Sequence, residues 1–257
     1  AVNGGTSCTC EVYSPHLPID PDRGYFIEVS PMGGYNPESA IYSGVSALMT
    51  WYRDNFGAED VAEAERAGRS VWEVIYGRAM DAPAGNIGLM LIPYFSGASG
   101  PFWDLRARGV MTGFLLDHQS PHMVRAILEG SAYESRLVKD LMEKGTGIPI
   151  REIRMYGGSA RSDVWNQIFA DVVNLPVTTT ETVETTALGA AMCAAGGAGL
   201  YASVADAAKG MSRVHRRYAP EPANARIYGR LYEEVYRELY PRIQDLMRTV
   251  SIITGCP

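Results

Sequence analysis

The chain has 257 residues, of which 46% are hydrophobic and 20% are charged, and its formal net charge is −6. This composition is ordinary for a folded globular protein with a large core. The negative balance argues against nucleic acid or an anionic membrane surface as the main partner. The sequence contains no apolar run of about 18 residues or more, so no transmembrane helix is predicted.

The first residues predict a β-hairpin with a Gly-Gly-Thr-Ser turn between two β-prone segments in the range 2–13. Cys8 and Cys10 are two residues apart and therefore share one face of the second strand. Together with Cys193 and Cys256 they form no CxxC pair, so we expect reduced thiols in a cytoplasmic protein. The first ten residues are neither basic nor apolar enough to predict a signal peptide. The chain begins with Ala, not Met, within a strand pattern, so we expect a segment of a longer protein.

The next part alternates strand and helix patterns. We expect a strand at 25–29, an amphipathic helix at 39–56, an exposed acidic helix at 59–66, a short helix at 71–80 and a buried strand at 88–95. Glycines then mark a turn and a bulge near residues 109 and 113. Asp104 lies in the same segment, and we interpret it as the surface partner of an arginine rather than as a catalytic base.

The strongest helix pattern follows. Ser120 as N-cap and Pro121 in the first turn predict its start, and Gly145 predicts its end. His118 and His122 flank its start. Two histidines at such a position can bind a metal or act in catalysis, but neither has a carboxylate partner at a suitable spacing, so we expect both to be structural.

The range 151–200 reads as strand, glycine turn, helix, strand and helix. Gly157 and Gly158 follow the first strand, and Ser162 is placed to cap the helix after them. A glycine turn that opens a helix presents free backbone N–H groups at the positive end of the helix dipole, which suits a nucleotide. The second helix is rich in small residues between 187 and 194, so it can approach a neighbouring backbone closely.

The C-terminal part predicts a short helix at 204–211, a solvated basic run at 213–217, a linker near Pro220 and a long amphipathic helix at 228–246. The tail at 251–257 is expected to be less regular.

The order GGSARSDVWNQIFADVVNLPV…ETTALGAAMCAAGGAGLY resembles the adenosine-binding segment of the FGGY family of carbohydrate kinases, members of the actin-like ATPase superfamily. The Gly5-Thr6-Ser7 turn and the run Ala107-Arg108-Gly109-x-x-x-Gly113 are similar to two further segments of the family. The resemblance extends from Gly4 to about Tyr240. It implies an α/β fold, an actin-like ATPase (ribonuclease H-like) domain with a mixed sheet flanked by helices.

The resemblance also implies roles for individual residues. Thr6, Gly109 and Gly113 would face the phosphates of ATP. The adenosine would lie on a floor made by Gly157, Gly158, Ser159 and Ser162. Residues 1–250 would be the C-terminal nucleotide-binding domain of a two-domain sugar kinase and 251–257 a tail, with the N-terminal domain absent from this chain. That absent domain would supply the catalytic carboxylate and hold Mg²⁺, so no catalytic or metal-binding residue is assigned here and this chain alone is expected to be inactive.

The function implied for the full-length protein is ATP-dependent phosphorylation of a sugar or polyol hydroxyl. Its partners would be that small molecule and its own N-terminal domain, with a second copy of the chain as a further candidate. The runs Trp51-Tyr52-Arg53-Asp54 and 93–97 favour pentulose or autoinducer-2 kinases over glycerol kinases.

Two other classes of protein remain as alternatives. One is a non-enzymatic actin-like module that binds a nucleotide. The other is a dinucleotide-dependent oxidoreductase, because Glu181 follows Gly158 at about the 20-residue spacing of a ribose-binding acid. However, GGSARS lacks the G-x-G-x-x-G order of that class.

Overall fold

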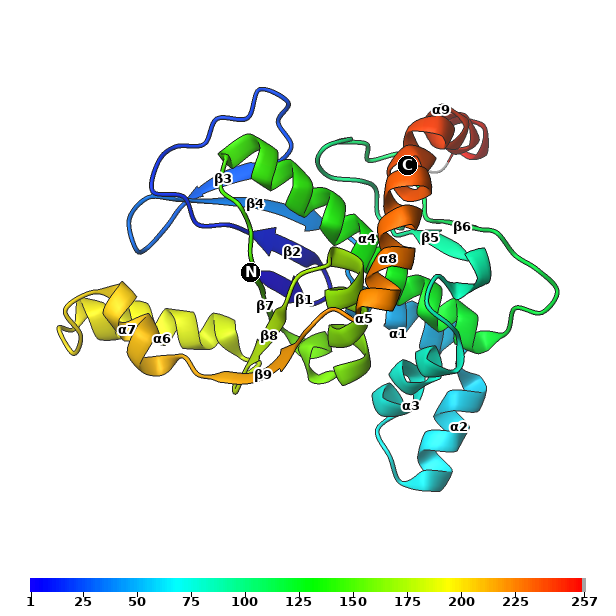
Figure 1. Ribbon diagram of the computed structural model, residues 1–257, viewed down its shortest axis with the longest axis horizontal. Coiled ribbons are helices and arrows are strands. Elements are labelled where there is room, and N and C mark those ends of the chain that lie inside the picture. The colour runs from blue at the N-terminus through cyan, green and yellow to red at the C-terminus, as the bar shows by residue number, and fades with distance from the viewer. Residues whose placement is uncertain (256–257) are drawn as a thin grey trace.

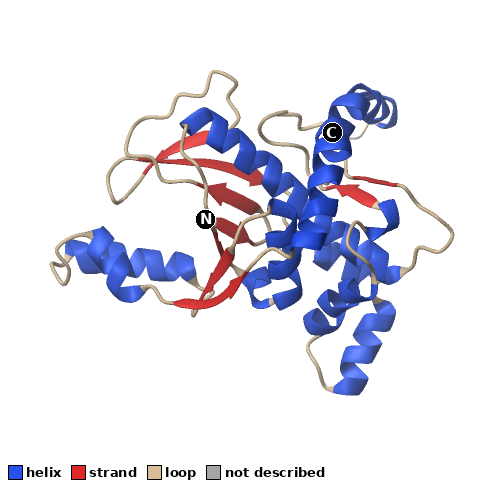
Figure 2. Cartoon of the chain, in the orientation of Figure 1, coloured by secondary structure: helices blue, strands red, loops and turns tan. Residues whose placement is uncertain are grey.

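The computed structural model describes residues 1–255, which form an α/β domain around a mixed sheet (Figures 1 and 2). The sheet has seven strands in the order β3-β4-β2-β1-β7-β8-β9. Their bounds are β1 (Val2–Gly4), β2 (Cys8–Glu11), β3 (Phe26–Val29), β4 (Tyr35–Ile41), β7 (Ile153–Tyr156), β8 (Val177–Thr180) and β9 (Val214–Tyr218). The pairs β1–β7 and β7–β8 are parallel and the others are antiparallel, so the predicted mixed sheet is confirmed.

Helices flank this sheet, and a small second sheet pairs β5 (Met90–Ile92) with β6 (Val110–Thr112). The α-helices are α1 (Val45–Asn55), α2 (Ala58–Ala67), α3 (Val71–Arg78), α4 (Ser120–Thr146), α5 (Asp163–Val173), α6 (Thr185–Gly197), α7 (Val204–Met211), α8 (Pro222–Leu231) and α9 (Arg237–Thr254). Short 3₁₀ turns span Ala79–Asp81, Asn86–Gly88 and Gly158–Arg161, and a π turn spans Tyr232–Tyr236. None of the helices within residues 1–255 is long and apolar enough to cross a membrane.

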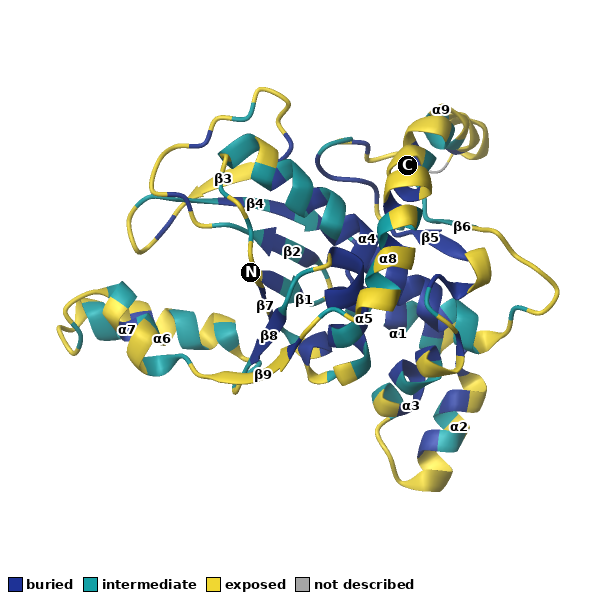
Figure 3. Ribbon diagram, viewed as in Figure 1, coloured by how far each residue is buried: buried dark blue, intermediate teal, exposed yellow. Residues whose placement is uncertain are grey.

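The hydrophobic core lies around α4 and α5, where most of the ribbon is buried (Figure 3). Trp165 and Phe169 of α5 and Ile127 of α4 are fully buried there. Cys8 and Cys10 both point into this core, as their spacing predicted, and they are free thiols together with the exposed Cys193. Cys256 lies outside the described residues. The predicted hairpin and its buried face are therefore confirmed.

Several predicted boundaries were wrong. The helix expected from residue 39 begins at Val45, because Tyr35–Ile41 pairs with β2 as a strand. Helix α4 is capped by Gln119 instead of Ser120, and it ends at Gly147, whose backbone is left-handed with φ of 69°. Gly145 lies inside this helix, where a side chain would press against the ring of Tyr25.

The acidic helix α2 is less exposed than predicted, because Asp60 is 3% exposed and accepts a hydrogen bond from Tyr52. The tail prediction was also wrong for its first part, since α9 continues through Thr254. Cys256 and Pro257 lie outside the described residues.

Helix α6 extends away from the sheet together with α7 (Figure 1). A side chain at Gly196 would meet the backbone of Val204 at 3.2 Å, so small residues do allow one close approach, to α7. Met192 is the buried residue of α6, and the remaining small residues of this helix are partly or fully exposed.

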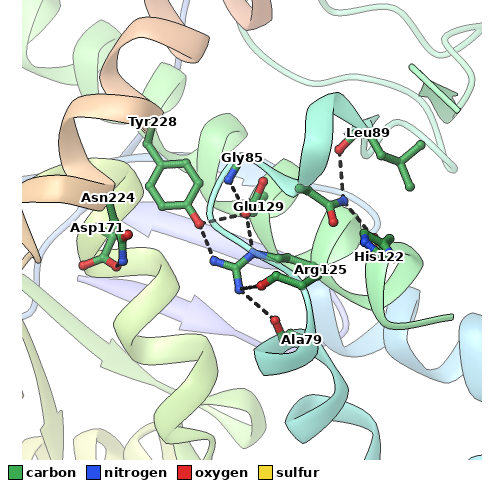
Figure 4. Close-up of polar contacts among 11 residues, drawn as sticks. Ala79, Gly85, Leu89, His122, Arg125, Glu129, Asp171, Asn224 and Tyr228 are labelled. Atoms are coloured by element: carbon green, nitrogen blue, oxygen red, sulfur yellow. Dashed lines mark hydrogen bonds and ion pairs between the residues drawn. The ribbon is translucent and has the colours of Figure 1, made fainter. Parts of the chain in front are cut away.

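The C-terminal helices dock onto the body of the domain through tyrosines spaced four residues apart. Tyr228, Tyr232, Tyr236 and Tyr240 each donate a hydrogen bond to a carboxylate, at distances from 2.7 to 2.9 Å; the acceptors are Glu129, Asp140, Glu134 and Asp104. Figure 4 shows the first of these pairs, where the Tyr228 hydroxyl meets the carboxylate of Glu129 beside the guanidinium of Arg125. This spacing places all four hydroxyls along one side of the helical segment.

Candidate functional site

A cavity of about 950 Å³ opens between α1, α3, the turn after β7 and the start of α6. Its volume is near the upper end of the range for small-molecule sites, about 300–1,000 Å³. The residues that line it include Ser46, Met49, Thr50, Arg69, Trp72, Glu73, Tyr76, Gly158, Ser159, Arg161, Ser162, Asp163 and Glu184. The cavity therefore joins segments that are more than 100 residues apart in the sequence.

One side of the cavity is the glycine turn that the sequence singled out. The backbone of Gly157 has φ of 86°, a conformation that favours glycine, and directs the chain from β7 into the 3₁₀ turn. A side chain at Gly158 would meet no atom within 4 Å, so this residue borders open space. Ser162 caps α5 by accepting a hydrogen bond from the Trp165 amide at 3.2 Å, as predicted.

The Ser159 side chain is 3% exposed, and its hydroxyl has no hydrogen-bond partner. A side chain at Gly4 would overlap this hydroxyl, which explains why the end of β1 carries glycine there. Because a buried hydroxyl without a partner costs free energy, its presence beside a cavity and a helix N-terminus favours a polar ligand.

The Gly5-Thr6-Ser7 turn adjoins the cavity through α1. The carbonyl of Thr6 accepts a hydrogen bond from the Gly44 amide at 2.8 Å, and the Ser46 hydroxyl donates to the carbonyl of Gly4 at 3.2 Å. Ser46 lines the cavity, whereas Thr6 is exposed and does not. The structure thus holds the turn against the wall of the cavity.

Gly109 and Gly113 do not line this cavity. They lie at the two ends of β6, and packing explains both glycines. A side chain at Gly109 would overlap the ring of Phe95, and one at Gly113 would overlap the carbonyl of Gly88. Gly113 also has φ of 91°. Neither glycine therefore contributes to the lining of this cavity, and their role toward the phosphates stays a prediction.

The sequence analysis missed the opposite wall. Ser46 and Thr50 of α1 line the cavity, and their spacing of four residues on a helix was the available signal. Tyr76 of α3 also lines it and is 7% exposed, and burial raises the pKa of its hydroxyl, so it stays protonated. No local pattern distinguishes Tyr76 from an ordinary core residue.

The two histidines near α4 act as caps. The Nδ1 atom of His122 accepts a hydrogen bond from the Gln119 amide at 3.1 Å, and that of His118 accepts one from the Leu115 amide at 2.8 Å. Within residues 1–255, no three or more His, Cys, Asp or Glu side chains are grouped as a metal site would require.

Asp104 does pair with an arginine, but the expected surface location was wrong. Its carboxylate is 6% exposed and accepts hydrogen bonds from the Tyr240 hydroxyl at 2.9 Å and from Arg248 Nε at 2.7 Å. Burial alone would raise the pKa of Asp104, but these two donors outweigh it and lower that pKa. The residue fixes the C-terminal helix to the loop before β6.

A family model described as "FGGY family of carbohydrate kinases, C-terminal domain" matches residues 1–198. The chain belongs to this family. The chain is 37% identical over 178 residues to a glycerol kinase of Azorhizobium caulinodans, covering 69% of this chain and 33% of that protein. It is 32% identical over 188 residues to a gluconokinase of Bacillus licheniformis, covering 72% of this chain and 36% of that protein.

Solved structures agree with this assignment. A ligand-bound xylulose kinase of Lactobacillus acidophilus superposes with a TM-score of 0.81 at 27% identity, covering 95% of this chain and 47% of that one. A gluconate kinase of the same organism gives a TM-score of 0.80 at 27% identity, covering 94% of this chain and 46% of that one. The chain therefore has the actin-like ATPase fold that the sequence predicted.

The chain spans about a third of the length of these curated relatives and about half of these solved chains. The relatives include glycerol, gluconate and xylulose kinases, so the preference for a pentulose or autoinducer-2 kinase stays a prediction. Sugar kinases of this family generally use ATP and Mg²⁺. The unpartnered Ser159 hydroxyl and the open space at Gly158 fit a nucleotide in the cavity.

Proposed function

We propose that this chain is the ATP-binding half of a cytoplasmic sugar or polyol kinase, whose full-length form phosphorylates a hydroxyl of that substrate. The observation that carries the proposal is the cavity beside Gly158, where a glycine turn, a helix N-terminus and a buried hydroxyl without a partner meet. This combination of open backbone and unpaired donors matches what a nucleotide needs.

In this proposal, the walls of the cavity contact different parts of the nucleotide. Gly158, Ser159 and Ser162 support the adenosine, and the backbone N–H groups at the start of α5 face its polar groups. Ser46 and Thr50 form the facing wall, and Thr6 lies beyond Ser46 on the turn that would approach the phosphates. Gly157 shapes the turn without lining the cavity, and Gly109 and Gly113 are left out because packing explains them.

The remaining parts of the reaction would come from a preceding domain. Phosphoryl transfer needs an aligned acceptor hydroxyl, a carboxylate close to it and Mg²⁺, which neutralises charge on the phosphates when it is bound. The proposed partner domain supplies the base, most sugar contacts and the metal site, and closure of the two domains excludes water. The C-terminal domain proposed here extends at least to Thr254, where α9 ends. Self-association of the protein stays an open proposal.

Substitution of Gly158 tests the location of the site. We expect Gly158→Val to weaken ADP binding by about tenfold or more, because its side chain enters the cavity; a factor of ten is about 1.4 kcal/mol. The measurement is calorimetric titration of the purified chain. Gly189→Val is the matched control, since a side chain at Gly189 also meets no atom within 4 Å but lies on α6, and it should bind ADP like the wild type. Unchanged affinity in a folded Gly158→Val variant would refute the site.

A second assay tests whether this chain needs the preceding domain for catalysis. ADP release is measured with a panel of pentuloses and polyols, for this chain alone and for the chain mixed with the preceding domain. We expect no sugar-dependent turnover by the chain alone and measurable turnover with its partner domain. Turnover by the chain alone would place a base within these residues. Nucleotide binding without turnover in the full-length protein would favour the non-enzymatic alternative.

A further inference from the structure

The wall opposite Gly158 belongs to α3 and is firmly held. Helices α2 and α3 form an excursion between α1 and β5 (Figure 1). The buried carboxylate of Asp60 in α2 accepts hydrogen bonds from Arg78 Nε at 2.7 Å and from the Tyr52 hydroxyl of α1 at 2.9 Å. Val74 and Ile75 of α3 are buried in the same region. These contacts fix the α3 wall as part of the domain core.

Tyr76 presents a polar group from this wall. Its side chain is 7% exposed and lines the cavity, yet its hydroxyl has no hydrogen-bond partner within residues 1–255. The Tyr133 hydroxyl also lacks a partner, but it is sealed inside the core and lines no part of the cavity. Tyr76 thus has the accessible, unpaired hydroxyl that a ligand can satisfy.

The two walls differ in chemistry. The side at 158–162 offers the N–H groups of a helix N-terminus and the side chain of Arg161, groups that suit the ribose. The α3 side offers the rings of Trp72 and Tyr76, with Met49 of α1 beside them, groups that suit a flat base; the charged Arg69 and Glu73 also line this side. A nucleotide whose ribose lies at 158–162 and whose phosphates extend toward the Thr6 turn therefore places its base toward α3.

We propose that Tyr76 is a specificity-determining residue whose hydroxyl forms a hydrogen bond with the edge of the nucleotide base. This inference rests on the proposed nucleotide site. A neutral phenol both donates and accepts, so it can pair with a ring nitrogen or with an exocyclic group of the base. A site built in this way rejects a ligand that leaves the buried hydroxyl unpaired.

The test uses Tyr76→Phe, which removes one oxygen atom. Affinities of the purified chain for ADP, adenosine and inorganic pyrophosphate are measured by titration, with adenosine in competition against ADP. We expect the affinities for ADP and adenosine to fall by the same factor, about five- to tenfold, and that for pyrophosphate to stay unchanged. The melting temperature without ligand should not fall, because the hydroxyl has no partner in the protein. Tyr133→Phe is the matched control and should bind all three ligands like the wild type.

Several outcomes would overturn the inference. They are unchanged adenosine affinity in Tyr76→Phe, a loss confined to ADP and pyrophosphate, or a lower melting temperature without ligand. Failure of the proposed function looks different, because the wild-type chain would then bind neither ADP nor adenosine. If the wild type binds ADP in a manner that depends on Gly158 while Tyr76→Phe has no effect, the nucleotide site stands and the role of Tyr76 does not.

Discussion

Polar groups are buried in two regions, the contact between α4 and the C-terminal helices and the cavity beside Gly158. The two regions differ in the hydrogen bonds that these groups form. In the first region, Glu129 accepts hydrogen bonds from Arg125 Nε at 2.7 Å, from the Tyr228 hydroxyl at 2.7 Å and from the Gly85 amide at 3.2 Å (Figure 4). Arg125 in turn donates to two backbone carbonyls, those of Ala79 and Ala82. These partners all lie inside the domain, so we call this contact a structural joint, although the neighbouring Tyr133 hydroxyl of α4 has no partner among the described residues.

The cavity also borders an unpaired polar group. The Ser159 hydroxyl has no partner among the described residues, and it adjoins Gly4. Tyr76 lines the same cavity from the other side. An unsatisfied buried group costs about 1–3 kcal/mol, so such groups are expected where a ligand supplies the missing partner. Because the joint also contains an unpaired hydroxyl, the feature that distinguishes the binding region is the open cavity beside such a group.

Removing a carboxylate from the structural joint should have the largest effect. Glu129→Ala leaves the Arg125 charge buried without its partner, so we expect a loss of about 3–5 kcal/mol in the free energy of unfolding. Urea denaturation measures it. Glu234→Ala is the control, because Glu234 forms an exposed pair with Arg230 and its removal should leave the free energy of unfolding almost unchanged. A loss below about 1 kcal/mol for Glu129→Ala would contradict the structural role.

Glu134 makes the same joint sensitive to pH. It accepts hydrogen bonds from Tyr94 and Tyr236 at 2.9 Å each, but burial outweighs them and raises its pKa from 4.5 to about 7. The folded state then holds a proton that the unfolded chain has lost, so the stability is complete below pH 4.5 and is lost as the pH rises through 7.

The Glu134→Gln variant isolates this effect. The stability of the wild type relative to this variant should fall by about 3 kcal/mol between pH 4.5 and 8, as judged from urea unfolding at each pH. Parallel stability curves for the two proteins would show that Glu134 does not titrate in this range.

The sequence predicted the parts of the fold that depend on neighbouring residues. The β1–β2 hairpin, the Ser162 cap and the bounds of α7 follow from turn residues, capping chemistry and local periodicity. The boundary near Ser39 failed for the opposite reason. Ser39–Ile41 is a strand because it pairs with β2, and that pairing joins residues about 30 positions apart.

The candidate site was predicted on one side only. The resemblance located Gly158, Ser159 and Ser162, which line the cavity. It also grouped Gly109 and Gly113 with them, although packing against Phe95 and Gly88 explains those two glycines. The α3 wall could not be predicted, because Tyr76 reaches the cavity only through the packing of α3 against distant elements.

Hydrogen–deuterium exchange of the chain with and without ADP tests the central claim most directly. The account predicts that ADP slows exchange in three segments, 44–50, 70–77 and 157–165, which line the cavity or adjoin its lining residues. It predicts no change at the β5–β6 hairpin, which includes Gly109 and Gly113, or at the joint between α4 and α8. Protection that appears at the hairpin and is absent from 157–165 would contradict the account, because the nucleotide would then bind outside the cavity beside Gly158.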